Sequence, residues 1–410
     1  MRFHTNMGAV ATLLFTLVAF QNVDAGPAYA RHQGGVPSPP PIVNVKNFGA
    51  MGDGIIDDTN AIQNAVNNAL STHRSVFFPP GTYLHAETIV FNGVAVTGSG
   101  NASVLLAANN TSNCGVILTG TGPSIQNMVI STAGLSFGNP NIYVYNAASF
   151  TIANDTFVQG AGVSAIKMQS SSVGTVSACY FDGTGNNNDG GVIIEQSHNV
   201  SVVNSLFQNE DVGVFVDSAQ PSQSIALVSN TIGSVSFPII AAGIKADGVS
   251  SLDIAQNTIQ MANSSPFIFS ISMTGDDQFT VANNNTWGGQ VGIFVQNAGP
   301  GSNFVTQNTI HNCGIQAIYT ANQSFTNIHI TGNQFGECGL LASGPSIGNA
   351  VILVVGSDPS GATTFVQNNI YQGHSNGLQS KVTCSFTAPH IPAANVTGNT
   401  QTQTALSDHI

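Results

Sequence analysis

Two aspartates at matching positions in neighbouring segments, together with a glutamate beside one of them, could perform acid–base chemistry. Asp189 and Asp211 each lie three residues before an apolar valine, and Glu210 stands beside Asp211. If the two segments stack as parallel strands about 4.8 Å apart, the aspartates become neighbours in space. One carboxyl could then protonate a glycosidic oxygen while another activates water or attacks the sugar carbon. The alternative is that both aspartates only terminate loops, where Asp is favoured anyway.

We expect Asp189, Glu210 and Asp211 to be the catalytic residues and to converge on one outward face lined by Lys245 and Phe215. Neighbouring carboxylates resist ionising together, which raises the pKa of one and suits it to donate a proton. A separation of about 5 Å fits a retaining hydrolase, and about 6.5 to 9.5 Å fits an inverting one.

A recurring apolar run predicts the strands that position these groups. Because side chains alternate between the faces of a strand, one column points inward and two point outward. The inward column is Ile166, Val192, Val214, Ile244, Ile293 and Ile318; one outward column is Lys167, Ile193, Phe215, Lys245, Phe294 and Tyr319, and the other is Gln169, Glu195, Asp217, Asp247 and Gln296. Exposed aromatic rings beside carboxylates and amides suit sugars, so we expect substrate binding by Lys245, Phe215, Glu195, Asp217 and Asp247.

A second motif, a polar residue followed two positions later by a large apolar one, recurs about every 25 residues. Its apolar members are Phe157, Phe181, Phe207, Ile232, Ile259, Trp287, Ile310, Phe335 and Ile370, and five polar members are Asn230, Asn257, Asn285, Asn308 and Asn333. Leucine-rich repeats need a leucine consensus and propeller blades need longer units. The repeat therefore predicts an all-β, single-stranded right-handed parallel β-helix with stacked asparagines at a turn.

The chain divides into five predicted parts. Residues 1–30 have the order of a secretory signal peptide, 31–41 form a linker, 42–83 form an N-terminal cap and first coil, 84–400 form the β-helix, and 401–410 form a C-terminal tail. Asp57, Asp58 and Thr59 are good N-cap residues for a helix that continues to Leu70. The acidic Gly-Asp-Gly segment before them could suggest a metal site, but turn and capping roles explain it.

Five cysteines, Cys114, Cys179, Cys313, Cys338 and Cys384, lie far apart without a Cys-x-x-Cys pair. The spacing gives no zinc or redox motif, and at least one thiol has no partner within the chain. Cys313 and Cys338 each follow an apolar member of the repeat by three residues. We expect their Cα atoms to lie about 5 Å apart, where a disulfide is possible.

Charged residues make up only 6% of the 410 residues, and the formal net charge is −12. A nucleic acid or an anionic membrane needs clustered Lys and Arg, so we expect neither as a partner. We predict a secreted protein, extracellular or periplasmic, whose partner is a polysaccharide and which uses no metal and no cofactor. The sequence does not decide the oligomeric state.

The segments Phe48 to Gly54, Asp57 to Thr59 and Phe78 to Tyr83 resemble the opening segment of the pectate lyase superfamily. This resemblance implies a pectin-lyase-like β-helix. Asn188-Asp189 and Glu210-Asp211 are similar to the Asn-Thr-Asp and Asp-Asp elements of polygalacturonases, which implies glycoside hydrolysis. The calcium-dependent lyases of the superfamily use an Arg, and no Arg follows Arg74.

A non-catalytic glycan-binding protein, either an adhesin or a tailspike-like surface β-helix, is an alternative interpretation. A polysaccharide lyase or an epimerase is a further alternative.

Overall fold

The computed structural model describes residues 42–108, 115–132, 139–160, 164–183, 190–217, 221–235, 242–261, 268–321, 327–336, 338, 352–354, 364–374 and 396–404. All of them belong to the compact unit Pro40–Ile410. The predicted signal peptide and linker, residues 1–41, lie outside the described residues, as does Asp189.

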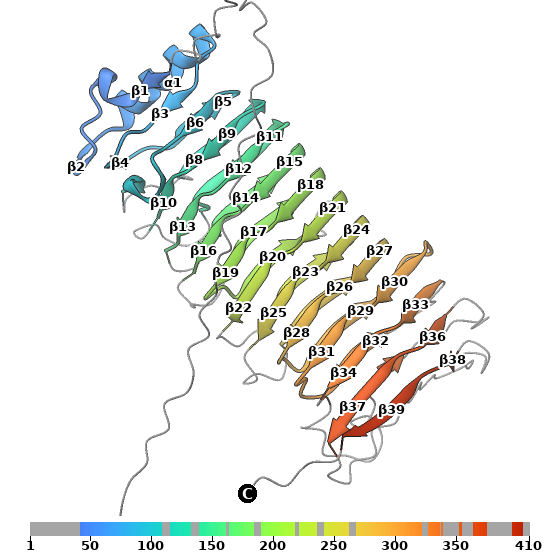
Figure 1. Cartoon of the computed structure of the whole chain (residues 1–410). Helices are drawn as coiled ribbons and strands as arrows, with labels where there is room; N and C mark the ends of the chain where they lie inside the picture. The colour runs from blue at the N-terminus through green and yellow to red at the C-terminus, as the bar shows by residue number, and fades with distance from the viewer. Residues whose placement is uncertain are drawn as a thin grey trace, which may run out of the picture. The chain divides into compact units, whose positions relative to one another are not determined.

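The described chain winds through three parallel ladders, which Figure 1 shows as rows of successive strands. The first ladder is β5 (Ile89–Asn92), β8 (Val116–Thr121), β11 (Ile142–Ala148), β14 (Ile166–Gln169), β17 (Gly190–Glu195), β20 (Val212–Val216), β23 (Ala242–Asp247), β26 (Phe269–Thr274), β29 (Val291–Gln296), β32 (Gln316–Ala321) and β35 (Ile352–Val354).

The second ladder follows the first in each coil. It is β1 (Val43–Asn44), β3 (Val76–Phe77), β6 (Ala95–Thr97), β9 (Ser124–Gln126), β12 (Thr151–Ala153), β15 (Ser172–Ser177), β18 (His198–Val203), β21 (Gln223–Val228), β24 (Ser250–Ala255), β27 (Asp277–Ala282), β30 (Asn303–Thr306), β33 (Ile328–Thr331), β36 (Phe365–Gln367) and β38 (Val396–Thr397). Strand β11 pairs with both β14 and β15, which joins these two ladders into one 25-stranded sheet.

The third ladder is a separate 14-stranded sheet. It is β2 (Asp53–Asp57), β4 (Gly81–His85), β7 (Ser103–Ala107), β10 (Val129–Ser131), β13 (Thr156–Val158), β16 (Tyr180–Asp182), β19 (Leu206–Gln208), β22 (Thr231–Val235), β25 (Thr258–Met261), β28 (Asn285–Trp287), β31 (Thr309–His311), β34 (Gln334–Gly336), β37 (Ile370–His374) and β39 (Thr400–Thr404). The all-β parallel solenoid is therefore confirmed, and β39 runs past the predicted end at residue 400.

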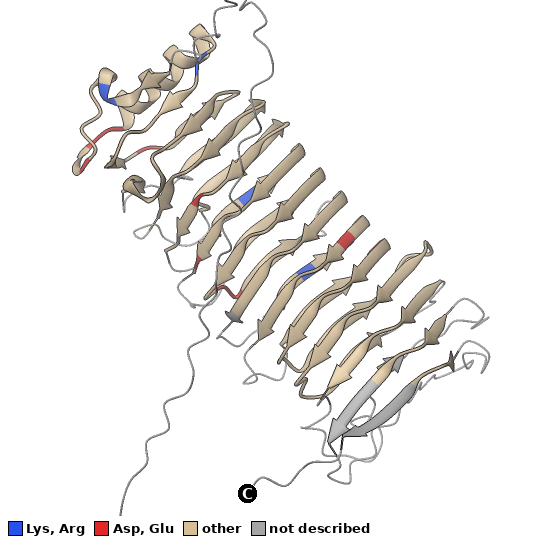
Figure 2. Ribbon diagram, viewed as in Figure 1, with Lys and Arg blue, Asp and Glu red and all other residues tan. Residues whose placement is uncertain are grey.

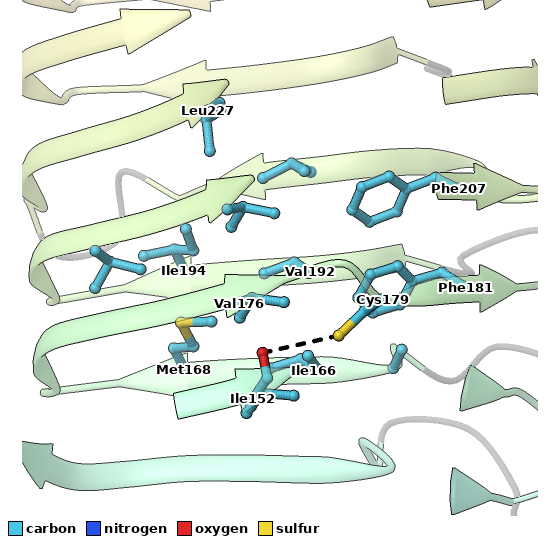
Figure 3. Close-up of a cluster of buried hydrophobic side chains, with 14 of the residues drawn as sticks. Ile152, Ile166, Met168, Val176, Cys179, Phe181, Val192, Ile194, Phe207 and Leu227 are labelled. Carbon is cyan, nitrogen blue, oxygen red and sulfur yellow. Dashed lines mark hydrogen bonds between the residues drawn. The ribbon is translucent and has the colours of Figure 1, made fainter. Parts of the chain in front are cut away.

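The inward column of the first ladder forms the centre of the core. Ile166 pairs with Val192, Val192 with Val214 and Val214 with Ile244, and the column continues through Ile271 to Ile293 and Ile318. All are fully buried. Figure 3 shows Ile166 and Val192 in the same interior as Val176 and Phe181, which come from the second and third ladders. The predicted inward positions are confirmed.

A glycine precedes most of these inward residues because the third ladder approaches closely there. A Cβ on Gly191 would lie 2.4 Å from Cδ1 of Phe207, and a Cβ on Gly292 would lie 2.4 Å from Cγ2 of Ile310. Contacts this short require the neighbour to move. The recurring Gly-Val and Gly-Ile pairs thus provide space for the large apolar residue on the third-ladder strand of the same coil.

The third-ladder anchors pair as predicted from Phe157 through Phe207 to Ile259, and again from Ile310 to Phe335. Two expected anchors were wrong by one residue. Thr286, fully buried, pairs with Ile259 and Ile310, whereas Trp287 is exposed. Phe335 pairs with Tyr371 rather than with Ile370.

Stacked asparagines stabilise the turn before the third ladder. Each side chain after Asn230 accepts hydrogen bonds from the preceding asparagine and donates one to a carbonyl of the previous coil, whereas Asn230 Oδ1 accepts the Ser205 N–H at 3.0 Å. Thus Asn257 N–H and Nδ2 both donate to Asn284 Oδ1 at 2.9 Å, and Asn284 Nδ2 donates to the Ile254 carbonyl at 2.8 Å. The asparagine ladder is Asn230, Asn257, Asn284, Asn308, Asn333, Asn369 and Asn399.

The expected member Asn285 was wrong, and the turn geometry gives the reason. The residue before each ladder asparagine has a positive φ, for example 58° at Gln256 and 56° at Asn283. Because Asn283 adopts the left-handed conformation, Asn284 is the residue that turns into the core. Asn285 is exposed on β28.

Helix α1 (Thr59–Thr72) starts at the predicted residue. The Asp57 carboxylate accepts the Thr59 N–H at 3.0 Å, and the Asp58 carboxylate accepts the Met51 and Gly52 N–H groups at 2.7 and 3.0 Å. The helix packs against η1 (Val45–Phe48), β1, β3 and β5. A second short 3-10 helix, η2, spans Gly100–Ala102. Asp58 is the N-cap residue but makes no side-chain capping bond, so the expected capping role was wrong for Asp58, whose carboxylate instead holds the preceding turn.

Cys313 and Cys338 form a disulfide with a Cα–Cα distance of 4.4 Å, which confirms that they occupy equivalent positions in adjacent coils. Cys179 is buried as a free thiol. Cys114 and Cys384 lie outside the described residues.

Two buried aspartates occupy turn positions that are filled elsewhere by neutral side chains. Asp155 stands where the asparagine ladder would continue, and its Oδ1 accepts the Met128 N–H at 2.8 Å. Asp276 accepts the Val249 N–H at 2.7 Å. Burial raises the pKa of Asp155 to about 8 and that of Asp276 to about 7. Below about pH 7 both carboxyls are therefore mostly in the protonated, neutral form that suits a dry turn.

Replacing Asn284 should reveal which asparagine is part of the ladder. We expect Asn284→Ala to lower the free energy of unfolding by about 2 kcal/mol or more, because buried groups of Asn257 and Ile254 lose their partners. The neighbouring Asn285→Ala is the matched control and should cost less than about 0.5 kcal/mol. Urea denaturation followed by circular dichroism measures both. Equal losses in the two variants would contradict the assignment of Asn284, rather than Asn285, to the ladder.

The buried aspartates predict that stability falls as pH rises. Above about pH 4 the unfolded chain releases the protons of these two aspartates, while the folded protein retains them. The free energy of unfolding therefore decreases with rising pH until the pH exceeds the folded pKa of each carboxyl. We expect the thermal midpoint to fall from pH 5 to pH 8. Asp155→Asn with Asp276→Asn should flatten this dependence, whereas Asp182→Asn on β16 should not. Equal slopes in all three proteins would show that these carboxyls are not the cause.

Candidate functional site

The outward face of the first ladder, from β14 to β29, is the candidate site. Its middle column pairs Lys167 with Ile193, Ile193 with Phe215 and Phe215 with Lys245. In the next column Gln169 pairs with Glu195. These pairings confirm the middle column from Lys167 to Lys245 and the first pair of the next column, and we call this surface the first-ladder face.

Opposite charges are paired on this face. Lys167 Nζ lies 2.8 Å from Glu195 Oε1, and Lys245 Nζ lies 3.0 Å from Asp247 Oδ2. Lys245 also lies over the Phe215 ring, 4.3 Å from its centroid. Figure 2 shows blue segments on β14 and β23, the strands that contain Lys167 and Lys245, among mostly uncharged strands. The face therefore presents little net charge, since each lysine has a carboxylate within ion-pair distance.

Asp217 lies directly after β20, where its N–H donates to the Ile194 carbonyl at 2.9 Å. Its side chain is partly buried. All five residues expected to bind substrate thus come from β17, β20 and β23 or the residue that follows β20. The register of the paired first-ladder strands brings these five residues together.

Sequence reasoning missed the contribution of β26. Ser272 continues the middle column between Lys245 and Phe294, and Thr274 continues the next column between Asp247 and Gln296. The available signal was Ser270-Ile271, a small residue before an inward isoleucine, which matches the Gly-Ile pairs of other coils. Phe269, at the start of β26, stacks on Phe294 with centroids 5.1 Å apart.

We expected Glu210 to point outward, but its side chain is buried. It is 1% exposed, and its Oε1 accepts a hydrogen bond of 2.8 Å from Nε2 of Gln159, which is 3% exposed. The side chain passes Gly183, where an added Cβ would lie 3.0 Å from Glu210 Cδ and 2.4 Å from the Asn209 carbonyl oxygen. Glu210 thus ties two non-adjacent coils together through a buried contact.

Asp211 immediately precedes β20 and is partly buried at the edge of the first-ladder face. The residue that follows it, Val212, pairs with Gly190, the residue that follows Asp189. The predicted offset between the two segments is therefore correct. The separation of the carboxyls of Asp189 and Asp211 stays a prediction, because Asp189 lies outside the described residues.

A family model, rhamnogalacturonase A/epimerase, pectate lyase-like, matches residues 42–260, which is more than half of the chain. The chain belongs to this family. The matched residues include the opening segment, α1 and strands β14 to β23 of the candidate site, whereas β26 and β29 lie beyond the match. Family membership gives the fold, while the reaction differs among the activities that the family name combines.

Known proteins share parts of this chain. It is 27% identical over 233 residues to a capsule K30/K69-specific depolymerase of Klebsiella phage K64-1, covering 46% of this chain and 30% of the depolymerase. It is 28% identical over 140 residues to the pre-neck appendage protein of Bacillus phage phi29, covering 34% of this chain and 14% of that protein. The chain thus spans less than a third of the length of either relative.

Among solved structures, the surface adhesin PfbA of Streptococcus pneumoniae has a TM-score of 0.63 at 17% identity, covering 84% of this chain and 93% of the adhesin. This likeness concerns the fold.

Within the described ranges, no group of three or more His, Cys, Asp or Glu side chains could hold a metal ion. No helix in that part of the chain is long and apolar enough to cross a membrane.

Removing the Glu210 carboxylate should destabilise the fold. We expect Glu210→Ala to lower the free energy of unfolding by about 1 to 3 kcal/mol, because the buried Gln159 amide loses its acceptor. Glu195→Ala, which removes only the partly exposed partner of Lys167, is the matched control and should cost less than about 1 kcal/mol. Chemical denaturation distinguishes the two. A Glu210→Ala protein as stable as the control would show that the buried contact has no structural role.

Proposed function

We propose that the protein binds a polysaccharide on the first-ladder face. The observation on which this depends is the group formed by Phe215, Lys245 and Asp247, with Glu195 and Asp217 beside them on a rigid sheet. An aromatic ring offers an apolar surface to the C–H groups of a sugar, and paired charges offer fixed hydrogen-bond donors and acceptors to its hydroxyls. The similarity to a capsule depolymerase is consistent with this ligand class.

A neutral or weakly charged glycan suits this face better than a polyanion. Both lysines of the face already have carboxylate partners, and the face has no unpaired basic cluster among its described residues. A polyanion would require such a cluster for steering and affinity. The ligand we propose is therefore a glycan whose repeating unit has few or no carboxylates.

Hydrolysis of the bound glycan is the second candidate function, with Asp189 and Asp211 as the reacting carboxyls. It is favoured by the position of Asp211 at the start of β20, next to the proposed binding residues, and by the pairing of Gly190 with Val212. Glu210 is not among the reacting groups of this candidate, because it is buried against Gln159. A non-catalytic binding role uses the same face without these carboxyls.

We also propose that the protein is exported and works outside the cytoplasm. The disulfide between Cys313 and Cys338 supports this location, because structural disulfides persist in oxidising compartments.

Glycan-array and affinity-electrophoresis measurements test the binding proposal. We expect retention by one or more neutral polysaccharides, and we expect Phe215→Ala to weaken it at least about tenfold. The control is Phe304→Ala, which removes a partly exposed aromatic side chain from β30 of the second ladder. If Phe215→Ala is retained as strongly as the unaltered protein, or if no neutral glycan retains the protein, the first-ladder face is not the binding site.

The catalytic candidate has its own measurement. New reducing ends from a retained polysaccharide would demonstrate hydrolysis. The variants Asp211→Asn and Asp189→Asn should each abolish the formation of reducing ends and leave the thermal unfolding midpoint nearly unchanged. Retention without products would leave binding as the function, and full activity in both variants would exclude these aspartates.

A further inference from the structure

Trp287 is the single tryptophan of the chain, and it lies on the outer surface of the third ladder. Its side chain is 47% exposed, although tryptophan is among the most costly side chains to leave in water. The core does not require it, since Thr286 fills the inward position of β28. An exposed large aromatic residue that the core does not need indicates a binding function.

The residues around Trp287 are polar and uncharged. Gln260 and His311 pair with Trp287 on either side, and the His311 ring is tilted by 41° with its centroid 5.6 Å from the indole. The adjacent outward column is Thr258, Asn285, Thr309 and Gln334. Strands β25, β28, β31 and β34 contain no Asp, Glu, Lys or Arg. We call this surface the Trp287 platform.

We propose that the Trp287 platform is a second glycan-binding site, specific for neutral saccharides. The indole would pack against the C–H face of one sugar ring, and the amides of Gln260 and Gln334 with the hydroxyl of Thr309 would bind hydroxyls of neighbouring rings. Successive coils lie about 4.8 Å apart, so the platform offers polar groups along several sugar units.

The charge and shape of the platform favour a saccharide over other occupants. A polyanion would need basic residues, which these four strands do not have. A protein partner would need a contiguous apolar area of several residues, whereas the described third-ladder neighbours of Trp287 present amides, hydroxyls and the His311 imidazole. A neutral saccharide needs one aromatic surface with hydrogen-bonding groups at its edge, and the platform provides both.

The Trp287 platform is separate from the first-ladder face. The chain passes from β28 to β29 through Gly288, Gly289 and Gln290, so the two surfaces lie on different sheets of the coil. The inference therefore does not depend on the proposed function of the first-ladder face.

Intrinsic fluorescence tests the proposal directly, because every tryptophan signal comes from Trp287. We would titrate the full chain with linear neutral hexasaccharides of glucose, galactose and mannose, and with hexagalacturonate as the anionic comparison. We expect a saturable change in emission with at least one neutral probe and none with hexagalacturonate. No saturable change with any neutral probe up to about 10 mM would overturn the proposal.

Variants assign the signal to the platform. Calorimetry should show that Trp287→Ala weakens binding of the active probe at least about tenfold, whereas the matched control Phe304→Ala leaves it unchanged. Gln260→Ala with Gln334→Ala keeps the fluorescent reporter and should also weaken binding, which covers the case in which Trp287→Ala does not fold.

Phe215→Ala separates the two sites. If it abolishes the emission change, the signal reports the first-ladder face and the platform is not a site. If the emission change persists in Phe215→Ala, the platform binds independently, even where the first-ladder face proves inactive.

Discussion

The structure depends on backbone hydrogen bonds between consecutive parallel coils. Each coil is held to the next at a fixed spacing, so any residue type repeated once per coil becomes a column in space. The asparagine ladder extends the same pattern into a turn, where Asn257 and Asn284 satisfy buried backbone and side-chain groups that no strand could satisfy. Since an unpaired buried polar group is costly, the asparagine ladder helps to hold the third ladder in register with the second.

Fixed register also explains how a chain with few charges builds two polar surfaces. On the first-ladder face, Lys245 reaches both Phe215 and Asp247 because the strands place them in adjacent positions. On the third ladder, Trp287 and Gln260 are neighbours for the same reason. The scaffold needs no flexible loop to assemble either group, so both surfaces are rigid before any ligand arrives. Such preorganisation reduces the entropy lost on binding.

The buried carboxyls illustrate a different use of acidic residues. Asp155 and Asp276 are neutral side chains in the folded protein at moderately acidic pH, and Glu210 anchors Gln159 across two coils. None of them projects into solvent as a catalytic group would. Asp211, which is partly buried directly before β20, is the described carboxyl that we propose for chemistry on a bound ligand.

The sequence by itself determined the repeat, the inward column from Ile166 to Ile318, the start of α1 and the proximity of Cys313 to Cys338. These features depend on local alternation and on a period that stacking converts directly into distance. The tertiary structure decided which of two neighbouring residues faces the core. Asn283, Asn284 and Asn285 are the same residue type, and only the left-handed turn at Asn283 selects Asn284 for the ladder and turns Trp287 outward. The tertiary structure also decided the direction of Glu210. Its contact with Gln159 passes Gly183 in the intervening coil, where a side chain would collide with Glu210.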